Sequence, residues 1–142
     1  PKVRMWGAID RTTNLNHGKW SKLQKGDILL FFRDKKYVVK MIIDGTEDNY
    51  DIAKMIWGIK DDHQTMNVQS RPDETWQLIM YSSPENVTRT DIEAKSLNKL
   101  LGYAENFRPT RTLDFTTVHE SRLQGLLDEY GSIQKALASI GL

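Results

Sequence analysis

The longest uninterrupted apolar run of the chain is Ile28–Phe32, which follows a Lys-Gly-Asp turn at residues 25–27. Its length suits a buried strand and falls far short of the roughly 20 apolar residues that a membrane-spanning helix needs. Glycine supplies the unusual backbone angles of a tight turn, and the neighbouring aspartate bonds nearby amides. The sequence therefore predicts a buried strand over residues 27–33, entered by a tight turn.

Further strand-like segments surround this run in the first 85 residues. Asp34-Lys35-Lys36 is typical of a hairpin turn. The polar stretches 10–18, 45–51 and 61–74 are predicted to be loops, and residues 20–23 a helical turn. The other predicted strands are residues 2–9, 37–44, 52–59 (with a short helix as the alternative) and 75–82.

The spacing of apolar residues changes after Pro84 and becomes helical. Helices are predicted over residues 91–101, 118–130 and 133–140, with Thr90, Thr117 and Ser132 as their N-caps and Gly131 as a stop. A β-rich part (residues 1–85) followed by a helical part (residues 86–142), without βαβ alternation, predicts an α+β fold. A length of 142 residues predicts a single domain.

Composition narrows the class of protein. With 39% hydrophobic and 27% charged residues, the chain is typical of a globular protein rather than a disordered one. Residues 1–10 contain no apolar segment of the kind that a secretory leader has, so a cytoplasmic location is expected. The absence of cysteine excludes disulfides, thiolate zinc sites and cysteine nucleophiles.

The net charge of +1 is unevenly distributed. Residues 1–71 hold 13 Lys and Arg against 9 Asp and Glu, a balance of +4, whereas residues 72–142 hold 7 against 10, a balance of −3. This asymmetry is compatible with an anionic partner that meets the first half of the chain. The alternative is a solvated surface without a partner.

The sequence gives no sign of an enzyme. His17, His63 and His119 lie far apart, and there is no paired-histidine metal motif, Gly-rich phosphate loop or GxSxG segment. We therefore expect no catalytic residues, no metal and no cofactor.

Four tryptophans stand at the ends of predicted strands and turns rather than inside apolar runs: Trp6, Trp20, Trp57 and Trp76. Indole rings in such places wall a pocket for a flat ligand or plug the end of a barrel. Trp6 and Trp57 are each followed by glycine, which lets a ligand or backbone approach closely, so they are the better pocket candidates. Trp20 and Trp76 are interpreted as core residues.

Several of these segments together resemble the PUA-like superfamily, which includes the EVE and YTH modules. Met5-Trp6-Gly7-Ala8, followed by a polar loop with Asn14 and Asn16, is similar to the opening of those modules, and residues 20–32 are similar to their barrel-entry strand. Residues 51–57 and 75–81 resemble EVE-like modules fused to restriction ATPases, where one strand ends in Trp and the next begins with Trp. The resemblance extends over most of the chain and implies a small twisted β-barrel with flanking helices.

The resemblance also implies a function, which is the recognition of a modified base in nucleic acid. Such a module flips the base into an aromatic pocket, and in McrB-type restriction systems an AAA+ GTPase motor and a nuclease subunit act with it. By position Trp6 matches the first cage residue, and Trp57 or Trp76 would supply a second wall, with Trp20 nearby. Asp10, Asn14 or Asn16 would bond the edge of the base, since an amide both donates and accepts. Gly7 stands where the family has Ser or Thr.

Contacts with the nucleic-acid backbone would come from basic residues in loops and turns, because phosphates attract Lys and Arg. The candidates are Arg4, Arg11, Lys19, Lys22, Lys35, Lys36 and Arg71. The alternative for Lys35 and Lys36 is a solvated face that protects a strand edge.

Three functions therefore remain open, and an enzyme of the related ASCH type is a more distant alternative. The first is a DNA-binding module that recognises methylated adenine or cytosine for a modification-dependent restriction system. The second is an RNA-binding reader of N6-methyladenine or another modified base. The third is a non-catalytic protein-interaction domain, in which the apolar faces at residues 97–101 and 123–130 dock a partner and the tryptophans are core.

Overall fold

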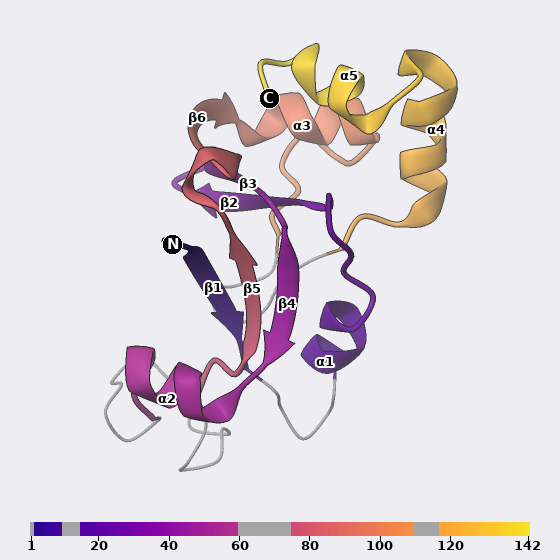
Figure 1. Cartoon of the computed structure of the whole chain (residues 1–142). Coiled ribbons are helices and arrows are strands. Elements are labelled where there is room, and N and C mark those ends of the chain that lie inside the picture. The colour runs from indigo at the N-terminus through magenta and orange to yellow at the C-terminus, as the bar shows by residue number, and fades with distance from the viewer. Residues whose placement is uncertain (1, 10–14, 60–74, 110–116) are drawn as a thin grey trace. The chain divides into compact units, whose positions relative to one another are not determined.

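A computed structural model of the chain describes residues 2–9, 15–59, 75–109 and 117–142 (Figure 1). These residues form five α-helices and two antiparallel three-stranded sheets, with strand orders β1-β5-β4 and β2-β3-β6. The elements are β1 (Arg4–Ala8), α1 (Leu15–Trp20), β2 (Ile28–Arg33), β3 (Lys36–Ile42), β4 (Gly45–Asp48), α2 (Tyr50–Trp57), β5 (Leu78–Ser82), β6 (Val87–Glu93), α3 (Ala94–Leu101), α4 (Glu120–Tyr130) and α5 (Ile133–Ala138). The predicted α+β class is confirmed, whereas the two sheets of the described residues do not form a closed barrel.

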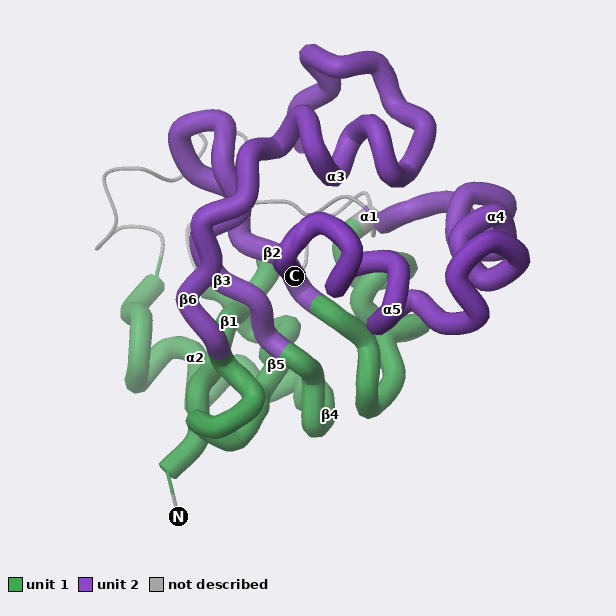
Figure 2. Tube along the Cα trace, turned by 90° about the horizontal axis from the view of Figure 1, so that it is seen from above, with its two compact units in different colours: residues 1–28, 42–87, 110–115 green, residues 29–41, 88–109, 116–142 purple. Residues whose placement is uncertain are grey.

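Two compact units divide the chain (Figure 2). Unit 1 comprises residues 1–28, 42–87 and 110–115, and unit 2 comprises residues 29–41, 88–109 and 116–142. The expectation of a single domain stays a prediction. None of the described helices has the length and apolar character needed to cross a membrane.

The sheet of unit 1 is built around β5, which pairs with β1 on one side and β4 on the other. Leu78, Ile79 and Met80 are at most 1% exposed, so both faces of this strand are covered. A central strand buried on both faces needs continuous apolar sequence, which Leu-Ile-Met provides. The strong strand predicted over residues 75–82 is therefore present, although only Leu78–Ser82 pairs.

The polar loop predicted over residues 45–51 is wrong at both ends, because Gly45–Asp48 forms strand β4 and helix α2 begins at Tyr50. Thr46 lies opposite Met80, and Asp48 lies opposite Leu78. An edge strand needs few apolar residues, since one side of it faces solvent and its pairing comes from a distant partner. Local composition therefore gave no strand signal.

The strand predicted over residues 52–59 is also wrong, and the alternative of a short helix is the observed one. The Asn49 side chain accepts a hydrogen bond from the Ile52 amide at 2.9 Å, as an N-cap does. Ala53 is fully buried, and Gly58, with φ of 76°, ends α2 after Trp57. Its apolar residues follow helical spacing, which a short segment does not distinguish from a strand.

Unit 2 begins with a hairpin between β2 and β3. Asp34 and Lys35 both have positive φ, 51° and 64°, which is the geometry of a two-residue type I′ turn. The predicted hairpin at residues 34–36 is confirmed.

The helical part predicted for residues 86–142 contains one strand, β6, which pairs with β3. Val87–Glu93 contains four β-branched side chains in seven residues, which favours a strand. Thr90 is accordingly not the cap of a helix starting at residue 91, and its hydroxyl donates to the Tyr37 carbonyl at 2.7 Å. The helix begins three residues later, at Ala94.

The helices of unit 2 pack through apolar residues on facing sides. Leu97 and Leu101 of α3, Leu126 of α4 and Leu137 of α5 are buried. His119, not Thr117, caps α4, and its ring nitrogen accepts from the Ser121 amide at 3.1 Å. The predicted stop at Gly131 (φ 85°) and cap at Ser132 are both observed.

Candidate functional site

Trp57 and Trp76 lie against each other in unit 1. Their ring centroids are 6.4 Å apart and their planes meet at 73°, which is the edge-to-face geometry that aromatic pairs prefer. Both residues are half-buried, so part of each indole faces solvent. The structure thus brings together two of the four tryptophans that the sequence singled out.

Gly7 makes this arrangement possible. A Cβ at this position would lie 2.5 Å from the Trp76 carbonyl oxygen and 3.0 Å from Cζ3 of Trp57. The close approach that we expected beside a glycine is therefore made by the protein itself. The absence of a side chain at Gly7 thus lets both tryptophans pack against strand β1.

Successive side chains of a regular strand alternate between its two faces, and the pairing of β1 with β5 is uninterrupted from Arg4 to Ala8. Trp6 precedes Gly7, so it extends from the face of β1 opposite to Trp57 and Trp76. It is 44% exposed. Trp6 and Trp57, the two predicted pocket walls, are therefore on different faces of the sheet.

Trp20 is half-buried, and its indole N–H donates to the Ile79 carbonyl at 3.1 Å. A buried tryptophan normally finds such a partner, and this bond ties the end of α1 to the central strand. The arrangement agrees with its interpretation as a packing residue.

The predicted base-edge residues differ in placement. Asn16 is 2% exposed, and its amide donates to the Ile9 carbonyl at 3.0 Å, so it takes part in the packing of unit 1. Asp10 and Asn14 lie outside the described residues. The Thr75 hydroxyl, next to Trp76 in sequence, is buried and has no hydrogen-bond partner among the described residues.

The predicted phosphate-contacting residues are shared between the two units. Arg4 and Lys22 are exposed and Lys19 is half-buried in unit 1, whereas Lys35 and Lys36 are exposed in unit 2. Arg11 and Arg71 lie outside the described residues.

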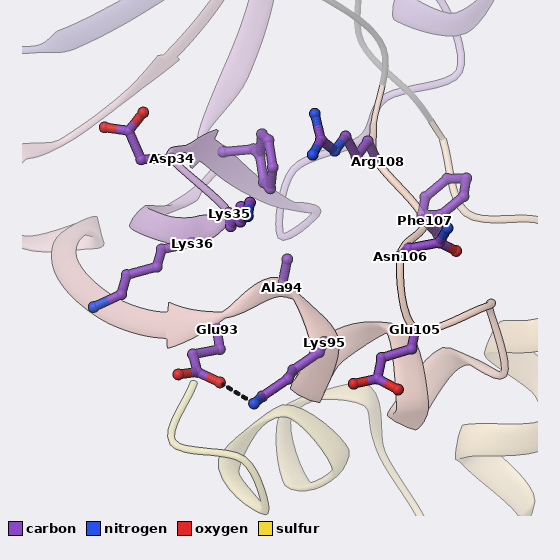
Figure 3. A pocket seen from close by; sticks show the side chains of 11 residues that line it. Asp34, Lys35, Lys36, Glu93, Ala94, Lys95, Glu105, Asn106, Phe107 and Arg108 are labelled. Carbon is purple, nitrogen blue, oxygen red and sulfur yellow. Dashed lines mark ion pairs between the residues drawn. The ribbon is translucent and has the colours of Figure 1, made fainter.

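Unit 2 contains a pocket of about 710 Å³ (Figure 3). This volume falls within the range of small-molecule sites. One wall comes from the β2–β3 hairpin, a second from the start of α3, and a third from the segment that follows α3. The lining residues are Phe32, Asp34, Lys35, Lys36, Glu93, Ala94, Lys95, Glu105, Asn106, Phe107 and Arg108.

The segment 105–108 is held by a buried side chain. Asn98, which is 1% exposed, donates to the carbonyls of Glu105 and Phe107, each at 3.0 Å. The hairpin is fixed from the other side, because the Ala94 amide donates to the Lys35 carbonyl at 2.9 Å. Both the 105–108 segment and the hairpin are therefore tied to α3 by hydrogen bonds.

Phe107 belongs to an aromatic stack. Its ring lies parallel to that of Tyr103, with centroids 4.1 Å apart and planes at 8°. The Arg122 guanidinium carbon lies 4.0 Å from the centre of the Tyr103 ring. Because one ring face cannot hold both neighbours at these distances, Arg122 and Phe107 cover opposite faces of Tyr103. Arg122 also donates to the Leu101 carbonyl at 2.8 Å, which fixes the stack to α3.

Ion pairs neutralise some of the pocket's charges. Lys36 bonds to Asp91 at 2.8 Å, and this hydrogen bond and the attraction of the carboxylate raise the pKa of Lys36. Lys95 pairs with Glu93 at 3.0 Å, which raises the pKa of Lys95 in the same way. A carboxylate oxygen of Asp34 lies 3.5 Å from Nε of Arg33. Within the described residues, Lys35 and Arg108 have no ion-pair partner.

Sequence reasoning missed Phe107, Arg108 and Asn106 as candidate site residues. A signal was present, since Tyr103 and Phe107 are spaced four residues apart and Phe107 begins a basic Phe-Arg-Pro segment. This signal could not be interpreted from the sequence alone, because the position of the segment depends on Asn98 of α3. The side-chain amide of Asn98 donates to the carbonyls of Glu105 and Phe107.

The described residues contain no group of three or more His, Asp or Glu side chains arranged to hold a metal ion. No protein-family model, no curated protein and no solved structure matches this chain.

Proposed function

We propose that this chain is a cytoplasmic nucleic-acid-binding module that recognises a modified base, methylated adenine or cytosine, in duplex DNA. It would act as the specificity module of a modification-dependent restriction system, with an AAA+ GTPase motor and a nuclease supplied by other domains or subunits. The order of the motifs around Trp6, Trp57 and Trp76 supports a PUA-like origin of the EVE or YTH type.

The observation that carries the proposal is the pair formed by Trp57 and Trp76. An edge-to-face pair leaves most of one ring face uncovered by its partner, and both indoles are partly exposed. A flipped base can stack on such a face, which contributes about 1–3 kcal/mol per base. Gly7 keeps both rings against β1, so the stacking surface is in place before the base arrives.

The test compares duplexes that carry N6-methyladenine, 5-methylcytosine or no modification, together with a methylated RNA strand of the same sequence. We expect the parent chain to prefer one methylated duplex and Trp57→Ala to lose that preference. The matched control is Trp6→Ala, which removes an indole from the opposite face of β1. Trp57→Phe keeps an aromatic ring and shows whether any loss comes from stacking or from misfolding.

The possible outcomes distinguish the proposal from its alternatives. Equal binding of methylated and unmodified duplexes by the parent would contradict base recognition. A loss caused by Trp6→Ala but not by Trp57→Ala would place the base on the other face of β1, against the proposal. Tight binding to the RNA strand alone would favour the RNA-binding reader.

A protein-interaction domain remains the second candidate, and one observation favours it. Met55 is 80% exposed and Ile56 is 49% exposed, so α2 presents adjacent apolar side chains to solvent. Of the two faces considered from the sequence, Leu97, Leu101 and Leu126 are buried within unit 2, whereas Leu127 is 39% exposed.

A further inference from the structure

We propose that the pocket of unit 2 is a second binding site, which takes one nucleotide unit with its phosphate at Lys35 and Arg108 and its base on Phe107. The nucleotide is either free or part of a strand. This site does not depend on the tryptophans of unit 1.

The charges of the pocket favour an anion at one place. Lys36 and Lys95 are neutralised by carboxylates, whereas Lys35 and Arg108 have no ion-pair partner among the residues that the structure describes. Figure 3 draws Glu93 and Glu105 well apart from Lys35 and Arg108, and the third carboxylate of the pocket, Asp34, lies 3.5 Å from Arg33. The described part of unit 2 is basic as a whole, with ten Lys and Arg against seven Asp and Glu.

The two cations suit a phosphate in complementary ways. The arginine guanidinium offers a planar fork of N–H donors that matches two phosphate oxygens, and the lysine ammonium adds a compact charge. The main chain of Lys35 is fixed by its carbonyl bond to the Ala94 amide and by the type I′ turn. The backbone of Lys35 therefore holds a fixed position in the pocket's wall.

Phe107 suits a base. Tyr103 covers one face of its ring at 4.1 Å, and Tyr103 is itself covered on its far side by Arg122. Phe107 lines the pocket whereas Tyr103 does not, so we assign the base to the ring surface that Tyr103 leaves uncovered. A base stacked there would extend an existing column of aromatic rings.

The polar edge of a base also finds partners in the pocket. Asn106 follows directly after the carbonyl that Asn98 holds, and its side-chain amide both donates and accepts. Asn106 is exposed, so its amide is accessible to a ligand. The pocket thus offers two cations for the phosphate, an aromatic ring for the face of the base and an amide for its polar edge.

The experiment measures binding of adenosine and cytidine monophosphates, a short single-stranded oligonucleotide and inorganic phosphate by calorimetry. Lys35→Ala, Arg108→Ala and Phe107→Leu are compared with the parent chain, and thermal unfolding checks that each variant folds. Lys99→Ala is the matched control, since it removes an exposed lysine of unit 2 that does not line the pocket. We expect each of the three pocket variants to weaken nucleotide binding by about tenfold, and the control by less than about twofold.

If the three pocket variants weaken the binding of a monophosphate, the result supports a free nucleotide as the ligand. If they weaken only the binding of the oligonucleotide, the result supports a nucleotide within a strand. Inorganic phosphate that binds as tightly as the nucleotides would overturn the role of Phe107. The proposal is overturned as a whole if nothing binds, or if Lys99→Ala weakens binding as much as Lys35→Ala. Trp57→Ala should leave the binding of the monophosphates unchanged, which separates the pocket from the base recognition proposed for unit 1.

Discussion

Gly7 lies directly against the backbone of Trp76, so closely that a Cβ added to the glycine would be 2.5 Å from the Trp76 carbonyl oxygen. Contacts this short with backbone atoms force the chain to move, since a carbonyl does not swing aside as the end of a flexible side chain does. The glycine is therefore a packing requirement of β1 and of the two indoles beside it.

Gly7→Ala is expected to lower the free energy of unfolding by about 1–3 kcal/mol, the usual cost of overpacking a well-filled site. Denaturation with urea measures the change. Gly18→Ala is the matched control in the same unit, because a Cβ at Gly18 has no neighbour within 4 Å. Gly18 is in α1, so its replacement should raise stability by about 0.5–1 kcal/mol. Equal effects of the two substitutions would show that the Trp76 contact is unimportant.

Asn98→Ala is expected to destabilise unit 2 by about 2–3 kcal/mol, because it leaves the carbonyls of Glu105 and Phe107 without their shared donor. The exposed Asn106, on the segment that Asn98 anchors, is the control, and Asn106→Ala should change stability by less than about 0.5 kcal/mol. Chemical denaturation measures both variants. An Asn98→Ala protein as stable as the parent would mean that the 105–108 segment is held by other contacts.

The cap residues and strands that the sequence predicted correctly are those set by local chemistry. Gly131 and Ser132 mark helix ends through their own backbone angles and hydroxyl, and the apolar Ile28–Phe32 run needs no partner to be recognised as a strand. The elements that the sequence missed depend on distant residues. Gly45–Asp48 is a strand because β5 is beside it, and Thr90 bonds to Tyr37 of another strand instead of capping a helix.

The same distinction applies to the candidate sites. The sequence singled out Trp6 and Trp57 as pocket candidates and Trp76 as core, but the contact of Trp57 with Trp76 through Gly7 and the separation of Trp6 required the register of β1 against β5. The pocket of unit 2 was not predicted, because its walls are brought together by contacts between separate segments, such as the hydrogen bonds of Ala94 and Asn98 to carbonyls of the hairpin and of the 105–108 segment.

Acid should weaken unit 1 through Asp44. Hydrogen bonds from the Ser83 amide and hydroxyl, the first at 2.7 Å, lower the pKa of this carboxyl from its ordinary value of 3.8. A carboxyl with a depressed folded pKa contributes stability that is present above the unfolded value and is lost as the pH falls through the folded value. We therefore expect the stability difference between the parent and Asp44→Asn to be constant at neutral pH and to shrink below about pH 4. Urea midpoints measured from pH 7 to pH 3 check this, and a constant difference over that range would contradict it.

The last prediction concerns which basic residues meet nucleic acid in the base-recognition mode proposed for unit 1. Each phosphate neutralised by Lys or Arg steepens the salt dependence of binding, with a slope of roughly −0.9 per contact on logarithmic axes. Arg4 and Lys22 are exposed in unit 1, so replacing either by alanine should make the slope less steep by about 1. Lys36 is paired with Asp91 in unit 2, and its removal should change the slope less, because the carboxylate already provides its counter-charge. Binding of a methylated duplex at several salt concentrations gives the three slopes. A slope that responds to Lys36→Ala and not to Arg4→Ala or Lys22→Ala would move the phosphate contacts away from unit 1 and contradict the proposed recognition mode.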